Sequence, residues 1–164
     1  MISIMNLEMT QFNTFDEALI QGDLETVYQA MIQAVSGHGG WWNTLWESEI
    51  IGDQPITQVG GCVKITVHSF FDVQFYARTV AIKDLERLHV EFYAGDFLGY
   101  GIWVWKAEGN KTRISQEWHA SPNSIKFYLA SKLIDIEMMH SKIIHKAFNT
   151  FNQYLCALNE RRVE

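Results

Sequence analysis

The chain has 164 residues, 48% of them hydrophobic, and a formal net charge of −6. This length suits a folded domain with its own core and room for an internal pocket. The excess of acidic residues gives no electrostatic reason to expect a nucleic acid or an anionic membrane as partner. No apolar run approaches the ~18 residues of a membrane span, and residues 1–9 do not match a secretory signal. We therefore expect a cytoplasmic protein without an integral membrane segment.

We expect a single domain over residues 1–164, with about ten residues at its start and about six at its end outside the ordered part. The two cysteines, Cys62 and Cys156, lack the spacing of a zinc site or a disulfide framework, and we interpret them as free thiols. Glu137 and His140 form an ExxH pair, but a metal site built on helices needs further carboxylates. Nucleotide-binding and hydrolase motifs are absent from the sequence. We expect no metal and no cofactor.

The first predicted elements are a strand over Phe12–Gln21 and a helix over Leu24–Val35, with Asp23 as the helix N-cap. Residues 36–40 contain three glycines and break the helix. We expect a second short helical turn after them, which would hold three tryptophans: Trp41, Trp42 and Trp46. Bulky aromatic side chains beside flexible glycines could form a gate.

The middle of the chain reads as short strands separated by turns, which indicates an antiparallel meander of six or seven strands including the first. Asp72-Val73 and Gly109-Asn110 are the expected hairpin tips. The predicted strands cover Glu47–Ile51, Cys62–Phe71, Gln74–Lys83, Leu88–Ala94, Gly99–Ala107 and Thr112–Ala120.

Counting outward from each tip predicts which side chains share a face of the sheet. Around Gly109-Asn110, Trp103 falls opposite Gln116 and Gly101 opposite Trp118, on the face that is apolar enough to be covered. Around Asp72-Val73, Val67 falls opposite Arg78 and Ser69 opposite Tyr76. We therefore expect Tyr76, Arg78 and Gln116 to point inward, unless a β-bulge reverses part of the assignment.

The last third of the chain reads as one uninterrupted helix from about Ser124 to Leu158, which would extend about 50 Å. His140 interrupts an apolar stripe on one side of this helix, found by placing residues at about 100° intervals. The stripe contains Leu129, Leu133, Ile136, Ile143, Ala147, Phe151, Tyr154 and Leu158. A stripe of this length needs a sheet to cover.

A strand, short helices, an antiparallel sheet and a long C-terminal helix resemble the helix-grip fold of the START and Bet v 1-like (SRPBCC) proteins. The resemblance covers about Thr14 to Leu155, and its motifs are similar to those of the polyketide cyclase/dehydrase-like branch. These motifs are Gly95–Trp103, Gly109–Arg113, Glu117-Trp118, the Trp41-Trp42 pair and the His140 region. The resemblance implies an α+β fold in which a curved sheet of six or seven strands wraps around the C-terminal helix, with two short helices after the first strand. It also implies an apolar cavity between sheet and helix.

Our main functional hypothesis is that this cavity binds a hydrophobic or aromatic small molecule or a lipid. Four residues would supply polar contacts in an apolar pocket: Tyr76, Arg78, Gln116 and His140. The walls would be Val67, Trp103, Trp118, Ile136 and Ile143, with Trp41 and Trp42 as a lid. Each of these residues also has a purely structural interpretation: a satisfied core histidine, an ion-paired or snorkelling arginine, and aromatic core packing.

Two other classes stay open. The first is a cyclase, dehydratase or aromatase in which His140 is the acid or base and Arg78 or Tyr76 polarises a carbonyl group. That reading requires His140 to lie close enough to Arg78 and Tyr76 to share one ligand. The second is a protein-interaction module, comparable to cochaperone relatives of the fold, which predicts an exposed apolar patch. A homodimer is compatible with either class.

Overall fold

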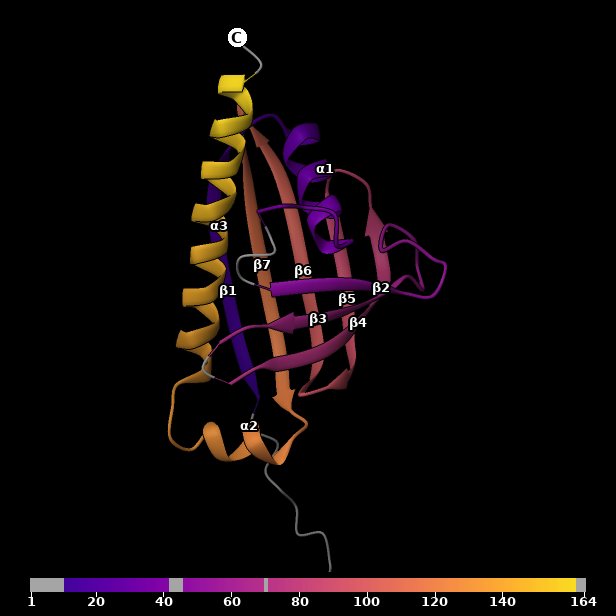
Figure 1. Cartoon of the computed structure of the whole chain (residues 1–164), viewed down its shortest axis with the longest axis vertical. Coiled ribbons are helices and arrows are strands. Elements are labelled where there is room, and N and C mark those ends of the chain that lie inside the picture. The colour runs from indigo at the N-terminus through magenta and orange to yellow at the C-terminus, as the bar shows by residue number, and fades with distance from the viewer. Residues whose placement is uncertain (1–10, 42–45, 70, 162–164) are drawn as a thin grey trace, which may run out of the picture.

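The computed structural model describes residues 11–41, 46–69 and 71–161. Within them, seven antiparallel strands form one sheet in the order β1-β7-β6-β5-β4-β3-β2, accompanied by three helices (Figure 1). The α+β fold with six or seven strands is thereby confirmed. The elements are β1 (Phe12–Gln21), α1 (Leu24–Val35), β2 (Trp46–Ile51), β3 (Cys62–Val67), β4 (Val73–Lys83), β5 (Arg87–Gly95), β6 (Phe97–Glu108), β7 (Lys111–Pro122), α2 (Ile125–Ala130) and α3 (Ile136–Arg161).

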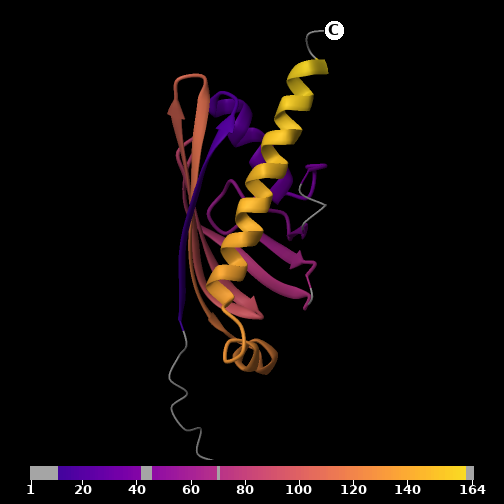
Figure 2. The same ribbon diagram turned by 90° about the vertical axis from the view of Figure 1, so that its left-hand side faces the viewer.

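The sheet is strongly curled, and α3 runs along its concave side (Figures 1 and 2). Helix α3 packs against β1, while α1 lies at one end of the sheet and α2 at the other. Two glycines help the strands to approach closely where the sheet bends. Gly99 has a φ of +145°, and a Cβ atom there would lie 2.0 Å from the His119 carbonyl oxygen of β7. Gly95 is similarly crowded by the backbone of β4.

The predicted strand over Phe12–Gln21 and the predicted helix over Leu24–Val35 are confirmed. Asp23 caps α1, because its carboxylate accepts a hydrogen bond from the Thr26 backbone N–H at 3.0 Å. Of the expected second helical turn, Trp41 lies in a turn and Trp46 begins β2, and the residues between them lie outside the described residues. Trp42 falls among residues 42–45, outside the described residues. The described part of the chain therefore has one helix between β1 and β2.

The expected single C-terminal helix is wrong, because the chain forms two helices with a break at residues 131–135. The Ser131 hydroxyl donates to the Tyr128 carbonyl oxygen, and the Asp135 carboxylate accepts from the Met138 N–H at 2.9 Å. These short polar side chains compete with the helical backbone pattern, and Asp135 satisfies an amide of the first turn of α3. At about 1.5 Å per residue, the 26 residues of α3 extend about 39 Å. No helix of the described residues is long and apolar enough to cross a membrane.

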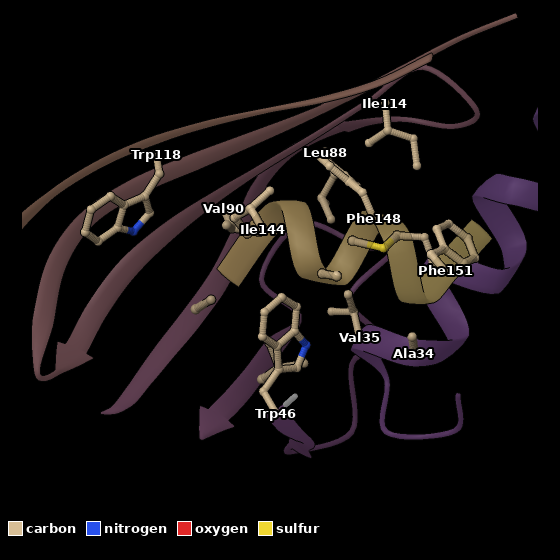
Figure 3. Packing of buried hydrophobic residues seen from close by; sticks show 14 of the residues in the cluster. Ala34, Val35, Trp46, Leu88, Val90, Ile114, Trp118, Ile144, Phe148 and Phe151 are labelled. Carbon is tan, nitrogen blue, oxygen red and sulfur yellow. The ribbon is translucent and has the colours of Figure 1, made fainter. Parts of the chain in front are cut away.

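The break also corrects the predicted stripe. Leu129 and Leu133 precede α3 and are exposed, at 57% and 86%. The side of α3 that faces the core contains Ile136, Ile144, Ala147, Phe148, Phe151 and Leu155. Figure 3 shows Leu88, Val90 and Ile114 projecting from the sheet toward Ile144 and Phe148.

The β6–β7 hairpin has the predicted register, with Trp103 opposite Gln116 and Gly101 opposite Trp118. The β3–β4 hairpin does not, because the chain turns between Val67 and Val73 and not at the predicted tip Asp72-Val73. Val67 pairs with Val73 and Cys62 with Arg78, a displacement of five positions along β4 from the predicted pairing. An odd displacement moves every side chain of β4 to the opposite face. Phe75 and Ala77 therefore face inward, whereas Tyr76 and Arg78 face outward.

Candidate functional site

A cavity of about 150 Å³ lies between the concave face of the sheet and α3. Almost all of its wall is hydrocarbon or aromatic, because strands β3 to β7 alternate apolar inward residues with outward polar ones. The lining includes Trp46, Val63, Ile65, Val67, Phe75, Ala77, Leu88, Val90, Phe92, Phe97, Trp103, Gln116, Trp118, Phe127, Ile136, Met139, His140, Ile143 and Ile144. Such a concave, apolar wall with few polar groups is typical of small-molecule sites.

The cavity reaches the surface at the α2 end of the molecule. Three of its lining residues are exposed there, Ser69 and Phe71 in the loop after β3 and Ile134 in the break before α3. Lys126 of α2 donates a hydrogen bond to the Asp72 carbonyl oxygen at 2.8 Å, which ties α2 to this loop. The mouth is thus bounded by the β3–β4 loop and by the connection between α2 and α3.

Seven of the residues selected from the sequence line the cavity together. They come from three strands and one helix: Val67, Trp103, Gln116, Trp118, Ile136, His140 and Ile143. The sequence reasoning missed the contribution of β4 and β5, including Phe75, Ala77 and Val90. The alternation of apolar residues along β4 was visible in the sequence, but the assumed hairpin tip assigned it to the wrong face.

Arg78 and Tyr76 do not line the cavity, which corrects their expected inward direction. The Arg78 guanidinium donates to the Glu91 carboxylate at 2.7 Å, and the two side chains are each 46% exposed. This hydrogen bond to Glu91 raises the pKa of Arg78. Tyr76 packs beside Tyr93 on the same outer face. Neither residue can share a ligand in the cavity with His140.

Trp41 is a core residue and not part of the cavity lining. It is buried, and its ring stacks on Phe151 of α3 with centroids 4.3 Å apart. The expected lid therefore has no support from Trp41, and Trp42 lies outside the described residues. Trp46, which the sequence reasoning named in the possible gate but not among the ligand-binding residues, lines the cavity.

His140 enters the cavity wall from α3, and its side chain is only 17% exposed. Its Nδ1 atom lies 3.0 Å from the Thr14 hydroxyl oxygen of β1 and 3.8 Å from the Asp16 carboxylate. Its ring stacks on the Trp118 indole, with centroids 4.2 Å apart and planes 7° from parallel. Since Nδ1 is turned toward β1, Nε2 lies on the side of the ring that is directed away from β1.

Burial lowers the pKa of His140 to about 3. Desolvation disfavours the charged imidazolium, so the ring is neutral at physiological pH. A neutral imidazole can donate or accept a hydrogen bond, but it supplies no proton as an acid near neutral pH. The chemistry of this position is therefore hydrogen bonding rather than acid catalysis.

Asp16 is a buried carboxylate, 4% exposed, between β1 and α3. It accepts a hydrogen bond from the Ser141 hydroxyl at 3.0 Å, and His145 Nε2 lies 3.2 Å from its other oxygen. Both partners are on α3, within the five residues that follow His140. Asp16 thus joins helix and edge strand beside the cavity, and it does not line the cavity itself.

Gln116 is a second buried polar residue in the wall. It is 4% exposed, and its Oε1 atom is buried without a hydrogen-bond partner among the described residues. In the sheet it lies between Asp16 of β1 and Trp103 of β6. A buried acceptor without a partner costs free energy, and the Gln116 carboxamide is a polar group in the cavity wall.

The two tryptophans of the wall differ in what they offer a ligand. The Trp118 ring is stacked on His140 and also contacts Phe12 and Phe97. The Trp103 ring contacts Phe148 by an edge, at a centroid distance of 6.4 Å, and is only partly buried. Trp103 is therefore the better platform for stacking a flat molecule.

No cluster of three or more potential metal ligands occurs in the part of the chain that the structure describes. Cys62 and Cys156 are free thiols, as expected from their spacing. The cavity wall offers aromatic surface and the hydrogen-bonding side chains of Gln116 and His140, with Ser69 at the mouth.

The low pKa of His140 predicts a specific pH dependence of stability. The unfolded chain takes up a proton near the ordinary pKa of 6.5, whereas the folded chain stays neutral until about pH 3. As the pH falls below about 6.5, the free energy of unfolding should decrease by about 1.4 kcal/mol per pH unit from this residue. Urea unfolding of the wild type and of His140→Gln across this range measures it.

In that experiment, Gln153→Asn, a change of an exposed and non-titrating side chain of α3, is the control and should retain the wild-type slope. His140→Gln should show a shallower slope than both. Equal slopes in all three proteins would contradict the neutral, buried state of His140.

No protein-family model and no curated protein matches the chain. Solved structures do match it. The protein TTHA0849 from Thermus thermophilus has a TM-score of 0.68 at 16% identity, over 89% of this chain and 98% of that one. Ginseng major latex-like protein 151 from Panax ginseng has a TM-score of 0.65 at 6% identity, over 88% and 97%. Norcoclaurine synthase from Thalictrum flavum has a TM-score of 0.57 at 10% identity, over 91% and 88%.

These identities are far too low to transfer an activity, and they show a shared fold. The polyketide cyclase/dehydrase-like branch stays a prediction, because the neighbours do not single it out. The curled seven-stranded sheet, the helix after β1 and the long helix α3 agree with the neighbours over nearly their whole length. The chain therefore has the helix-grip fold that these structures share.

Proposed function

We propose that this protein binds a hydrophobic or aromatic small molecule in the cavity between the sheet and α3. The observation that supports the proposal most is the composition of the wall, which is apolar and aromatic apart from Gln116, His140 and, at the mouth, Ser69. A binding role needs no more than this wall and an opening. The opening lies at Phe71 and Ile134.

The structure supports the enzyme alternative less well than the sequence does. It required Arg78 or Tyr76 to polarise a carbonyl group beside His140, and both side chains lie on the other face of the sheet. The pKa of His140, lowered to about 3, also removes its role as an acid near neutral pH. The fold itself admits catalysis, since one structural neighbour is a synthase. Catalysis here would need a group that the cavity wall does not supply.

We place this function in the cytoplasm. The free thiols Cys62 and Cys156 support that proposal, because unpaired cysteines are typical of a reducing compartment.

Filling the cavity should abolish binding. Ala77 is 2% exposed and lines the cavity, so Ala77→Leu places three additional carbon atoms in it. We expect the affinity for 4-fluorotoluene, measured by fluorine NMR titration, to fall about tenfold or more, because the probe and the new side chain compete for one volume.

Ala81→Leu, the same change at an exposed position of β4, is the control and should bind as the wild type does. Thermal unfolding of both variants checks that the fold is retained. Unchanged affinity in folded Ala77→Leu would place the probe elsewhere and contradict the proposal.

A homodimer remains a second proposal, supported by exposed apolar side chains at the α2 end. Ile125 and Leu133 are 80% and 86% exposed, and Leu129 and Met138 are also exposed. The segment over residues 123–134 carries Lys126 and Lys132 and no acidic residue, although the whole chain has a net charge of −6. This surface lacks the acidic repulsion expected between two copies elsewhere.

Sedimentation velocity over a range of concentrations tests the dimer. We expect the wild type to dimerise and Leu133→Glu to stay monomeric, because the new carboxylate would be buried in the interface. Val59→Glu changes another exposed apolar side chain, in a different loop, and should still dimerise. A monomeric wild type at every concentration would exclude this role for the surface.

A further inference from the structure

We infer that α2 is a lid on the cavity, and that a ligand enters and leaves when α2 moves away from the β3–β4 loop. Phe127 is the side chain that closes the mouth, and Lys126 holds α2 in the closed position. This inference rests on the proposed binding function and adds how access to the same cavity is controlled.

Helix α2 closes the end of the cavity that reaches the surface. Phe127 is the buried residue of α2, at 5% exposure, and it lines the cavity. Its ring packs on Phe97 of β6, with centroids 4.8 Å apart. Phe71 and Ile134, which line the same cavity, are exposed at this end. A ring-sized molecule that enters here therefore passes Phe127.

Helix α2 is short, and one of its six residues is buried. On its outward side, Ile125 and Leu129 are 80% and 57% exposed. Segments with few buried apolar contacts open at a lower cost in free energy than the core does, and lids are drawn from such segments. Helix α2 can therefore move while the sheet and α3 stay folded.

The connections at the two ends of α2 suit a hinged movement. Before α2, the Asn123 N–H donates to the Asp96 carbonyl oxygen at 2.8 Å, and the Asn123 side-chain amide donates to the Gly95 carbonyl oxygen at 2.9 Å. After α2, residues 131–135 form turns rather than helix. The chain is thus anchored at Asn123, and residues 131–135 can absorb the change of backbone angles.

Lys126 is the contact that holds the lid closed. Its Nζ atom donates a hydrogen bond to the Asp72 carbonyl oxygen of the β3–β4 loop at 2.8 Å and lies 3.8 Å from the Asp96 carboxylate. It also lies 4.6 Å from the centroid of the Phe127 ring. Asp96 is fixed in turn, because its carboxylate accepts from the Gln74 N–H of β4 at 2.9 Å. Lys126 therefore connects α2 to the β3–β4 loop and to the turn between β5 and β6.

The strength of this contact suits a lid that opens reversibly. The Lys126 side chain is 45% exposed, and an exposed ion pair stabilises a closed state only modestly. Lys126 is not one of the lining residues of the cavity. Its removal should therefore loosen the lid without changing the wall that a ligand contacts.

Exchange measurements with 4-fluorotoluene test the lid. Saturation transfer in fluorine NMR gives the dissociation rate of the probe, and titration gives its affinity. In Lys126→Met, dissociation should be about threefold faster, because the closed lid loses an exposed charged contact. The affinity should change by less than about twofold, since a lid that opens more often speeds association and dissociation equally.

Phe127→Ala removes the ring that closes the mouth, and dissociation should be about tenfold faster or more. The matched controls are Lys142→Met and Phe15→Ala, which change an exposed lysine of α3 and an exposed aromatic residue of β1. Both should keep the wild-type rate. Thermal unfolding checks that each variant folds, and Phe127→Leu serves should Phe127→Ala fail to fold.

Wild-type dissociation rates in both folded α2 variants, with binding retained, would overturn the lid and leave the proposed function intact. An affinity of Lys126→Met that falls by the same factor as its dissociation rate rises would also overturn the lid, because Lys126 would then stabilise the bound state. No binding of the probe to the wild type would overturn both the lid and the proposed function.

Discussion

The attachment of α3 to β1 is the interaction on which the rest of this structure depends. β1 is an edge strand that pairs only with β7, so its other edge presents backbone groups without strand partners. Side chains of α3 satisfy several of them. Glu137 accepts from the Asn13 N–H at 2.7 Å, and Asn152 accepts from the Gln21 N–H at 2.8 Å. The helix is therefore held along the full length of one edge strand.

This one-sided attachment explains why a cavity exists. The sheet curls away from β1 through β7, β6 and β5 to strands β4, β3 and β2, so its far side lies opposite the helix rather than directly against it (Figure 2). Large side chains such as Trp46, Trp103 and Phe75 fill much of the space between them. Close packing is reached near Ile144, Phe148 and Phe151, and about 150 Å³ stays open toward the α2 end.

The same arrangement determines the chemistry of the site. The polar groups that bind α3 to β1 lie beside the cavity, where burial keeps His140 a neutral ring stacked on Trp118. Gln116, next to Asp16 in the sheet, lies between these polar groups and the apolar wall of the cavity. A wall of this kind recognises a small aromatic molecule by shape and by one or two hydrogen bonds, with no charged group to stabilise a reactive intermediate.

Most of the fold could be predicted from the sequence because its signals are local. Gly109-Asn110 fixed the register of β6 and β7, and with it the inward direction of Trp103, Gln116 and Trp118. The β3–β4 pairing could not be predicted, because the loop length depends on tertiary contacts and a small change reverses the face of Arg78. Asp135 caps α3 and so marks the break before this helix. In a sequence, such a capping aspartate is hard to distinguish from an exposed aspartate within a helix.

A crystal structure of the chain soaked with iodobenzene would test the central claim most directly, because anomalous scattering locates the iodine atom without ambiguity. The account predicts one ordered iodine between the concave face of the sheet and α3, with the ring beside Trp103. Iodine found only at surface sites, with the space between Trp103, Ala77 and Ile143 filled by protein side chains, would contradict it.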